Sequence, residues 1–221
     1  MPMTRRLLPF QPTLDLLAQR WGSAGPLLAG FPLLARGRPL PVAEIADATG
    51  ADVHRIEEAL DAARCERDAR GRLIDLYGLT LTPTLHRLEI GSRALFSCCA
   101  LWAHVIPKLV ATTVRVESVD PLRREIVRLW LSSGGIERVE PAGAAASLAV
   151  ARREAIAASV GAAFCSQVRH FVSRDSAEEF AAARPSCDVL DLAELQEAAD
   201  YLHAAIWTAA GARARPGPGP G

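Results

Sequence analysis

The sequence lacks any apolar run long enough to cross a lipid bilayer. No segment approaches the roughly 20 uninterrupted apolar residues that a transmembrane helix requires. The first nine residues, Met1 to Pro9, are basic, but they have neither a sustained apolar stretch nor a small-residue cleavage site, so they do not have the pattern of a secretion signal. We therefore expect a cytoplasmic protein that does not enter a membrane.

An excess of charge of one sign is also missing, because 25 Lys and Arg residues balance 25 Asp and Glu residues. Proteins that bind nucleic acids or anionic membranes usually carry a basic surface, so nucleic acid is not an expected partner. The spacings Cys-x-x-Cys and His-Glu-x-x-His do not occur, which leaves a zinc finger or a metalloprotease without support. Nor does the sequence contain a P-loop or a Gly-x-Gly-x-x-Gly fingerprint.

What the chain does contain is an odd number of cysteines at irregular spacing: Cys65, Cys98, Cys99, Cys165 and Cys187. A chain of 221 residues can bury a real core without disulfides, so this pattern favours reduced thiols in the cytoplasm. Cys99 and Cys165 have similar apolar neighbours, in Phe96 to Trp102 and in Ala163 to Ser166. Thiolate pairs are the ligands that soft metals prefer, and we therefore single out these two cysteines as a candidate metal site.

The first part of the chain predicts helices. Apolar residues recur at helical spacing over residues 12–34, with a break at 22–26. A short helix ends at Gly50, a second begins after a predicted N-cap at Asp52, and a hairpin turn follows at residues 68–71. This order is typical of a winged helix, which either binds DNA or serves only as a packing module. Because the second helix is acidic, it is a poor surface for phosphates, and DNA contact is not favoured.

The second part mixes strands and helices. Alternating patterns predict strands over residues 85–90, 113–119 and 125–131. Further expected elements are a helix over 99–106 stopped by Pro107, a helix over 151–160, a strand over 164–172, a helix with a capping box at Ser176 and Glu179, and a last helix over 192–209. The predicted fold is α+β with antiparallel strands: a winged-helix-like module (1–82), a mixed domain (83–210) and a disordered Pro/Gly tail (211–221).

Four ordered blocks carry a resemblance to a known family. They are Tyr77-Gly78-Leu79-Thr80-Leu81-Thr82, Cys99-Ala100-Leu101, Val139-Glu140-Pro141-Ala142-Gly143 followed by Ser147-Leu148, and Phe164-Cys165 followed by Phe171. In order and spacing they resemble the alkylmercury (organomercurial) lyases, over roughly residues 33–173. The resemblance implies an enzyme that cleaves the carbon–mercury bond by protonolysis, releases a hydrocarbon and keeps Hg(II) as bound product, with no separate cofactor.

The same resemblance implies the roles of two cysteines and an aspartate. The cysteines match Cys99 and Cys165, which would serve as nucleophile and metal ligands, while the family aspartate falls at Trp102. A further family cysteine aligns with about Asp120. An indole donates only a hydrogen bond and cannot act as the acid. The resemblance also implies a small organomercurial or thiol-bound substrate, with Hg(II) passed on to cellular thiols or to a mercuric reductase.

Other side chains are candidates for the missing proton donor. The thiol of Cys165 is the first candidate and His104 the second, although a helix would turn His104 away from Cys99. Cys98 is a further auxiliary residue, and whether it faces the same ion stays open. Two alternatives remain: a protein that binds a soft metal through its thiols for sequestration or sensing, and an enzyme for another small organic substrate whose pocket Trp102 shapes.

Overall fold

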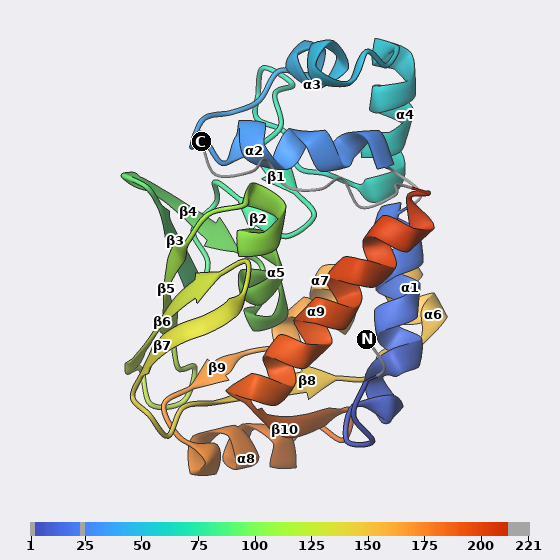
Figure 1. Ribbon diagram of the computed structural model, residues 1–221. Helices are drawn as coiled ribbons and strands as arrows, with labels where there is room; N and C mark the ends of the chain where they lie inside the picture. Colours follow the sequence, from blue (N-terminus) through green and yellow to red (C-terminus); the bar gives the residue numbers. More distant parts are fainter. Residues whose placement is uncertain (1–2, 23–24, 212–221) are drawn as a thin grey trace.

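The computed structural model describes residues 3–22 and 25–211, so the predicted tail lies outside the described residues except for Gly211. Helices dominate the first third of the chain, as predicted (Figure 1). They are η1 (Leu8–Phe10), α1 (Gln11–Gly22), η2 (Gly25–Ala29), α2 (Gly30–Leu34), α3 (Val42–Thr49) and α4 (Val53–Ala63). Within the described residues, no helix is both long enough and apolar enough to span a bilayer.

The helix-turn-helix forms as its sequence predicts. Helix α3 ends at Gly50, whose φ of +66° lies in the left-handed region that glycine adopts without strain. Helix α4 begins after Asp52, whose carboxylate accepts a hydrogen bond of 2.8 Å from the His54 backbone N–H. The wing is reduced to a tight turn, because only an isolated bridge pairs Arg67 with Leu73.

Two antiparallel sheets follow, as the α+β prediction requires. One has seven strands in the order β1-β2-β4-β3-β5-β6-β7, and the other has three in the order β10-β8-β9. The strands are β1 (Asp75–Leu76), β2 (Leu79–Thr80), β3 (His86–Ile90), β4 (Arg93–Ser97), β5 (Val114–Val119), β6 (Ile126–Ser132), β7 (Gly135–Glu140), β8 (Ala145–Ala149), β9 (His170–Phe171) and β10 (Cys187–Asp191).

The remaining helices pack against these sheets. They are α5 (Ala100–Val110), α6 (Arg153–Ala158), α7 (Val160–Ala163), η3 (Cys165–Gln167), α8 (Arg174–Ala182) and α9 (Leu192–Ala209). Helix α9, red in Figure 1, crosses the molecule between α5 and α1. Helix α5 is buried from Ala100 to Pro107, which is typical of a helix surrounded by protein on all sides.

Three local predictions were wrong. Helix α5 does not stop at Pro107 but continues to Val110, because the Pro107 carbonyl accepts the N–H that closes the last turn. The N-cap of α8 is Ser173 rather than Ser176, since the Ser173 hydroxyl accepts the Ser176 N–H. The expected strand over residues 164–172 is mostly the turn η3, with only β9 extended; the Ser147 hydroxyl binds its backbone at Gln167 and Arg169.

Asp120 connects the two sheets through hydrogen bonds and should contribute to the stability of the fold. Its buried carboxylate accepts hydrogen bonds from the backbone N–H groups of Leu122, Arg123 and Val172 and from the Ser176 hydroxyl, at 2.8 to 3.0 Å. We expect Asp120→Ala to lower the free energy of unfolding by about 2–5 kcal/mol, because several buried donors lose their acceptor.

Urea unfolding followed by circular dichroism measures this change. The control is Asp175→Ala, on the same helix as Ser176 but exposed, which should cost less than about 1 kcal/mol. Equal unfolding free energies for the two variants would contradict the structural role of Asp120.

Candidate active site

Three thiols meet at one point in the protein. The sulfurs of Cys98, Cys99 and Cys165 all lie within 4.8 Å of one another, and those of Cys98 and Cys165 are 3.3 Å apart. Cys99 and Cys165 are buried, whereas Cys98 is only partly buried. The two cysteines singled out from the sequence are therefore neighbours in space, and Cys98, whose side the sequence left open, joins them.

The backbone around these thiols is tied down from three directions. Cys98 and Cys99 connect the end of β4 to the start of α5, and the Cys98 N–H donates to the Gly78 carbonyl at 2.9 Å. The Ser97 hydroxyl donates to the Cys99 carbonyl at 2.9 Å. The N–H of Ala100 donates to the Val168 carbonyl at 3.1 Å, which fixes the start of α5 against the segment that carries Cys165.

The surroundings of the three thiols shift their pKa values in different directions. Burial opposes ionisation of Cys99, but hydrogen bonds from Cys165 and Cys98, the Trp102 backbone N–H and the charge of Arg169 hold the pKa of its thiol well below the usual value. Hydrogen bonding to Cys165 and Cys99, together with burial, raises the pKa of Cys98. The hydrogen bond from Cys98 favours ionisation of Cys165. The hydrogen bond between Cys165 and Cys99, together with burial, has the larger effect and raises the pKa of Cys165. Cys99, at the N-cap of α5, is therefore the most acidic of the three thiols.

A cavity of about 300 Å³ opens beside the thiols. Cys98 and Cys165 lie in its wall together with the aromatic side chains of Trp21, Tyr77 and Trp102. Among the described residues, the Tyr77 hydroxyl and the Trp102 indole N–H are buried without a hydrogen-bond partner. Buried polar groups normally find partners, so two unpaired donors in one cavity wall indicate a place for a ligand or for water.

Trp102 is both a wall of this cavity and part of the core. It is 1% exposed, its ring meets that of Trp21 edge-on with centroids 4.5 Å apart, and it stacks at 6.3 Å on Phe31. A Cβ atom on Gly78 would lie 2.5 Å from the indole, so only glycine fits there.

We expect Trp102→Ala to lower the free energy of unfolding by about 3–5 kcal/mol, because it leaves a large cavity between these rings. Denaturant unfolding measures the loss. Trp130→Ala, at a half-buried tryptophan of β6, should cost much less. A Trp102→Ala protein as stable as the Trp130→Ala protein would show that the indole is not part of the core.

His104 lies apart from the thiol cluster. Its Nδ1 is 2.8 Å from Gln196 Oε1 and its Nε2 is 3.1 Å from His170 Nε2. The hydrogen-bonded chain continues from His170 through Ser118 to His86, with 2.8 Å at each step. Within the part of the chain that the structure describes, no histidine or carboxylate joins the three cysteines as a possible metal ligand.

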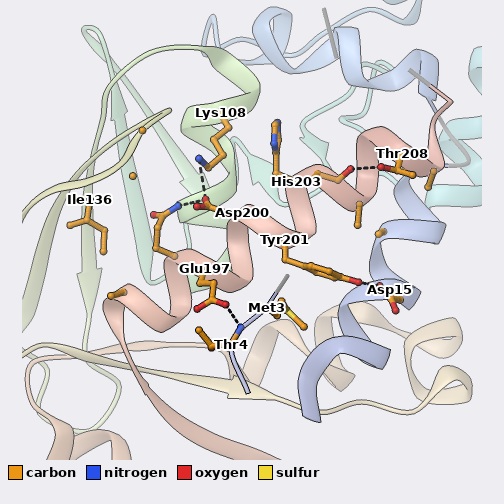
Figure 2. A pocket seen from close by; sticks show the side chains of 18 of the residues that line it. Met3, Thr4, Asp15, Lys108, Ile136, Glu197, Asp200, Tyr201, His203 and Thr208 are labelled. Carbon is orange, nitrogen blue, oxygen red and sulfur yellow. Dashed lines mark hydrogen bonds and ion pairs between the residues drawn. The ribbon is translucent and has the colours of Figure 1, made fainter. Parts of the chain in front are cut away.

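A second, larger cavity of about 1050 Å³ runs along α9 and contains none of the predicted site residues. Figure 2 shows its polar side chains directed at one another: Lys108 at Asp200 and Tyr201 at Asp15. These contacts measure 3.0 Å and 2.5 Å. Because these groups already satisfy each other, the thiol cavity is the better candidate for chemistry.

Comparison with known proteins agrees with the thiol geometry. Residues 79–203 match the family model for alkylmercury lyase, and residues 12–76 match the helix-turn-helix domain of alkylmercury lyase. The chain belongs to the alkylmercury lyase family. Family membership makes it an enzyme of this class. The alkylmercury lyase of Staphylococcus epidermidis is 34% identical over 173 residues, 78% of each chain, and that of Streptomyces lividans is 33% identical over 177 residues, 80% of each.

The fold of this lyase also matches a solved structure. The crystal structure of the mercury-bound form of MerB2 superposes with a TM-score of 0.65, at 16% identity, over 85% of this chain and 98% of that one. The predicted helical module followed by an antiparallel α+β domain is thus confirmed. Sequence reasoning missed the cavity residues Asp75 and Tyr77, although Tyr77 begins the first family-like block.

Proposed function

We propose that this lyase cleaves the carbon–mercury bond of small organomercurials by protonolysis and keeps Hg(II) on Cys99 and Cys165. The observation that carries the proposal is the convergence of three sulfurs within 4.8 Å beside a cavity with aromatic walls. Soft Hg(II) binds thiolate in preference to oxygen or nitrogen ligands, and the aromatic wall suits an organic group on the metal.

The order of events follows from the ionisation of the thiols. Cys99 is the most readily ionised of the three, so its thiolate attacks R–Hg–X first and displaces X. Cys165 then loses its proton as it binds the same mercury, because metal coordination favours deprotonation of a thiol. Two thiolates increase the electron density on mercury and make the attached carbon basic. A proton on that carbon completes the reaction and releases R–H.

The source of this proton is the open step. If the family aspartate corresponds to Trp102, as the sequence blocks imply, the site needs another acid, because an indole donates only a hydrogen bond. Cys165 brings its own proton to the site, whereas both ring nitrogens of His104 are already hydrogen-bonded, one to Gln196 and the other to His170. Among the two donors named from the sequence, the geometry favours Cys165.

We further propose that the protein works in the cytoplasm and passes Hg(II) to cellular thiols or to a mercuric reductase. The five cysteines are free, which suits a reducing compartment. The cavity is the route by which a competing thiol reaches the metal. The helix-turn-helix is proposed as a packing module, with residues 1–82 and 83–210 as the two parts of the chain.

Benzene release from phenylmercury tests the function. In buffer with excess cysteine, the wild-type protein should produce several equivalents of benzene per chain, measured by headspace gas chromatography against buffer alone. An alternative function remains because of Trp102: a protein that binds mercury through its thiols without turnover. Stoichiometric binding of Hg(II) with no benzene would establish that alternative and overturn the lyase proposal.

A further inference from the structure

Asp75 lies in the wall of the thiol cavity. It begins β1 and faces the same 300 Å³ space as Cys98, Cys165 and Trp102. The other carboxylate in this wall is Glu66. No sequence pattern pointed to Asp75, which sits in the otherwise apolar stretch Leu73-Ile74-Asp75-Leu76-Tyr77. An acidic side chain in an apolar strand next to a candidate active site needs a physical reason.

A short hydrogen-bond path connects the Asp75 carboxylate to the backbone of Cys98. The Gly78 backbone N–H donates to the Asp75 carboxylate, and the Gly78 carbonyl accepts from the Cys98 N–H at 2.9 Å. Strand β2 also pairs with β4 at Leu79 and Ser97, one residue before Cys98. The N–H and the carbonyl of one residue, Gly78, therefore bind the Asp75 carboxylate and the backbone of the first cysteine of the cluster.

The turn that carries Asp75 is rigid and strained. Tyr77 and Gly78 form the two-residue connection between β1 and β2, with φ of +46° and +91°. A left-handed conformation is rare for a tyrosine and costs free energy, and such strain clusters at functional sites. Gly78 also packs directly on the Trp102 ring. The turn thus fixes the position of the Asp75 carboxyl relative to the cysteines.

The surroundings of this carboxyl bring its pKa close to neutral pH, so that both its ionised and its protonated forms are accessible. Burial and, to a lesser extent, the negative charge of Glu66 raise the pKa of Asp75 to about 7, against the opposing hydrogen bond from Gly78. The other titratable or charged groups in the cavity wall are Arg20, Arg64, Cys65, Tyr77, Cys98 and Cys165. A general acid–base works best when its pKa is close to the operating pH.

We propose that Asp75 is the general acid–base of the reaction and replaces the aspartate that Trp102 has displaced. This inference rests on the proposed function. The Asp75 carboxylate takes the proton from the Cys165 thiol as that sulfur binds mercury. The resulting carboxylic acid then gives the proton to the carbon atom, the electron pair of the carbon–mercury bond forms the new C–H bond, and Hg(II) stays on two thiolates. The carboxylate is regenerated, so the sum of R–Hg–X and two thiols gives R–H, the dithiolate complex and HX.

Single-turnover benzene release tests Asp75 separately from metal binding. Each variant is loaded with one equivalent of phenylmercury, binding is quantified by mercury analysis after desalting, and benzene is then followed over time. We expect Asp75→Asn to bind phenylmercury like the wild type but to release benzene about 10²–10⁴-fold more slowly, the usual contribution of a general acid–base. Asp75→Glu keeps the acid and should recover part of the rate.

Chemical rescue distinguishes a proton donor from a structural residue. In Asp75→Ala, added formate can enter the vacated space, so the rate of benzene release should rise with formate concentration; a merely structural role would not respond. The matched control is Asp61→Asn, an exposed carboxylate of α4, which should behave like the wild type. Circular dichroism confirms that each variant is folded.

Two results would overturn the role of Asp75 while leaving the lyase proposal intact. One is a wild-type rate in Asp75→Asn, and the other is a rate loss in Glu66→Gln without one in Asp75→Asn. A wild-type protein that binds phenylmercury but releases no benzene would instead overturn both proposals. If Asp75→Asn does not fold, the formate response of Asp75→Ala decides the question, and its absence counts against Asp75.

Discussion

Benzene release should disappear in Cys99→Ser and in Cys165→Ser, with a loss of about 10³-fold or more in each. The reason is that a serine hydroxyl neither ionises at neutral pH nor binds soft Hg(II) well. In Cys99→Ser the first attack fails, because Cys99 is the thiol whose pKa lies below the usual value. In Cys165→Ser the first attack survives, but the second sulfur ligand is missing.

The two variants should therefore differ in how they bind substrate. Cys165→Ser should still take up one phenylmercury per chain and hold it without cleavage, whereas Cys99→Ser should bind it more weakly. Mercury analysis after desalting and headspace chromatography measure the two properties. Cys187→Ser is the matched control, since Cys187 is a free cysteine outside the cluster. Wild-type benzene release from either cluster variant would contradict the proposed site.

Stability should fall steeply below about pH 6.5 because of three buried histidines. Burial, followed by the charges of Arg169 and His104, lowers the pKa of His86 to about 3. Burial lowers the pKa of His104 to about 4. Burial, together with the charges of His104 and His86, lowers the pKa of His170 well below the usual value. In the unfolded chain each takes up a proton near pH 6.5, whereas in the folded protein it does not. Folding stability from these groups is present above pH 6.5 and is lost as pH falls toward 4 and 3.

The expected loss between pH 7 and pH 5 is about 2 kcal/mol for each of His86 and His104, and His170 adds to the loss in the same direction. This is comparable with the total stability of an ordinary domain. Urea unfolding at the two pH values measures it. His104→Gln should remove about 2 kcal/mol of this loss, while His54→Gln, at an exposed position, should leave it unchanged. Equal stability of the wild type at pH 7 and pH 5 would mean that the folded protein accommodates charged imidazoles.

The helices and strands that are determined by residues close together in the sequence were predictable. The Asp52 cap, the stop at Gly50, the three alternating strands and the last helix all follow from spacing and side-chain chemistry within a few residues. Local rules failed where a distant group decided the outcome. Ser147 binds the backbone of residues 167 and 169 and converts most of an expected strand into a turn.

The site was predictable only in part, for the same reason. Cys99 and Cys165 were recognisable from ordered blocks, but their contact depends on a hydrogen bond between Ala100 and Val168, 68 positions apart. The position of Cys98 depends on the hydrogen bond from its N–H to the Gly78 carbonyl, which the sequence around Cys98 does not predict. Asp75 looked like an ordinary strand residue, because its meaning comes from the cavity that the fold builds around it.

The contact between Gly78 and Trp102 also constrains how this enzyme can change. An aspartate in place of Trp102 would be left in a void bounded by Trp21, Phe31 and a glycine that has no side chain to fill it. Such a carboxylate would be poorly positioned, and the protein would lose stability before it gained an acid. A carboxylate therefore cannot be introduced at position 102 by one substitution without a loss of stability.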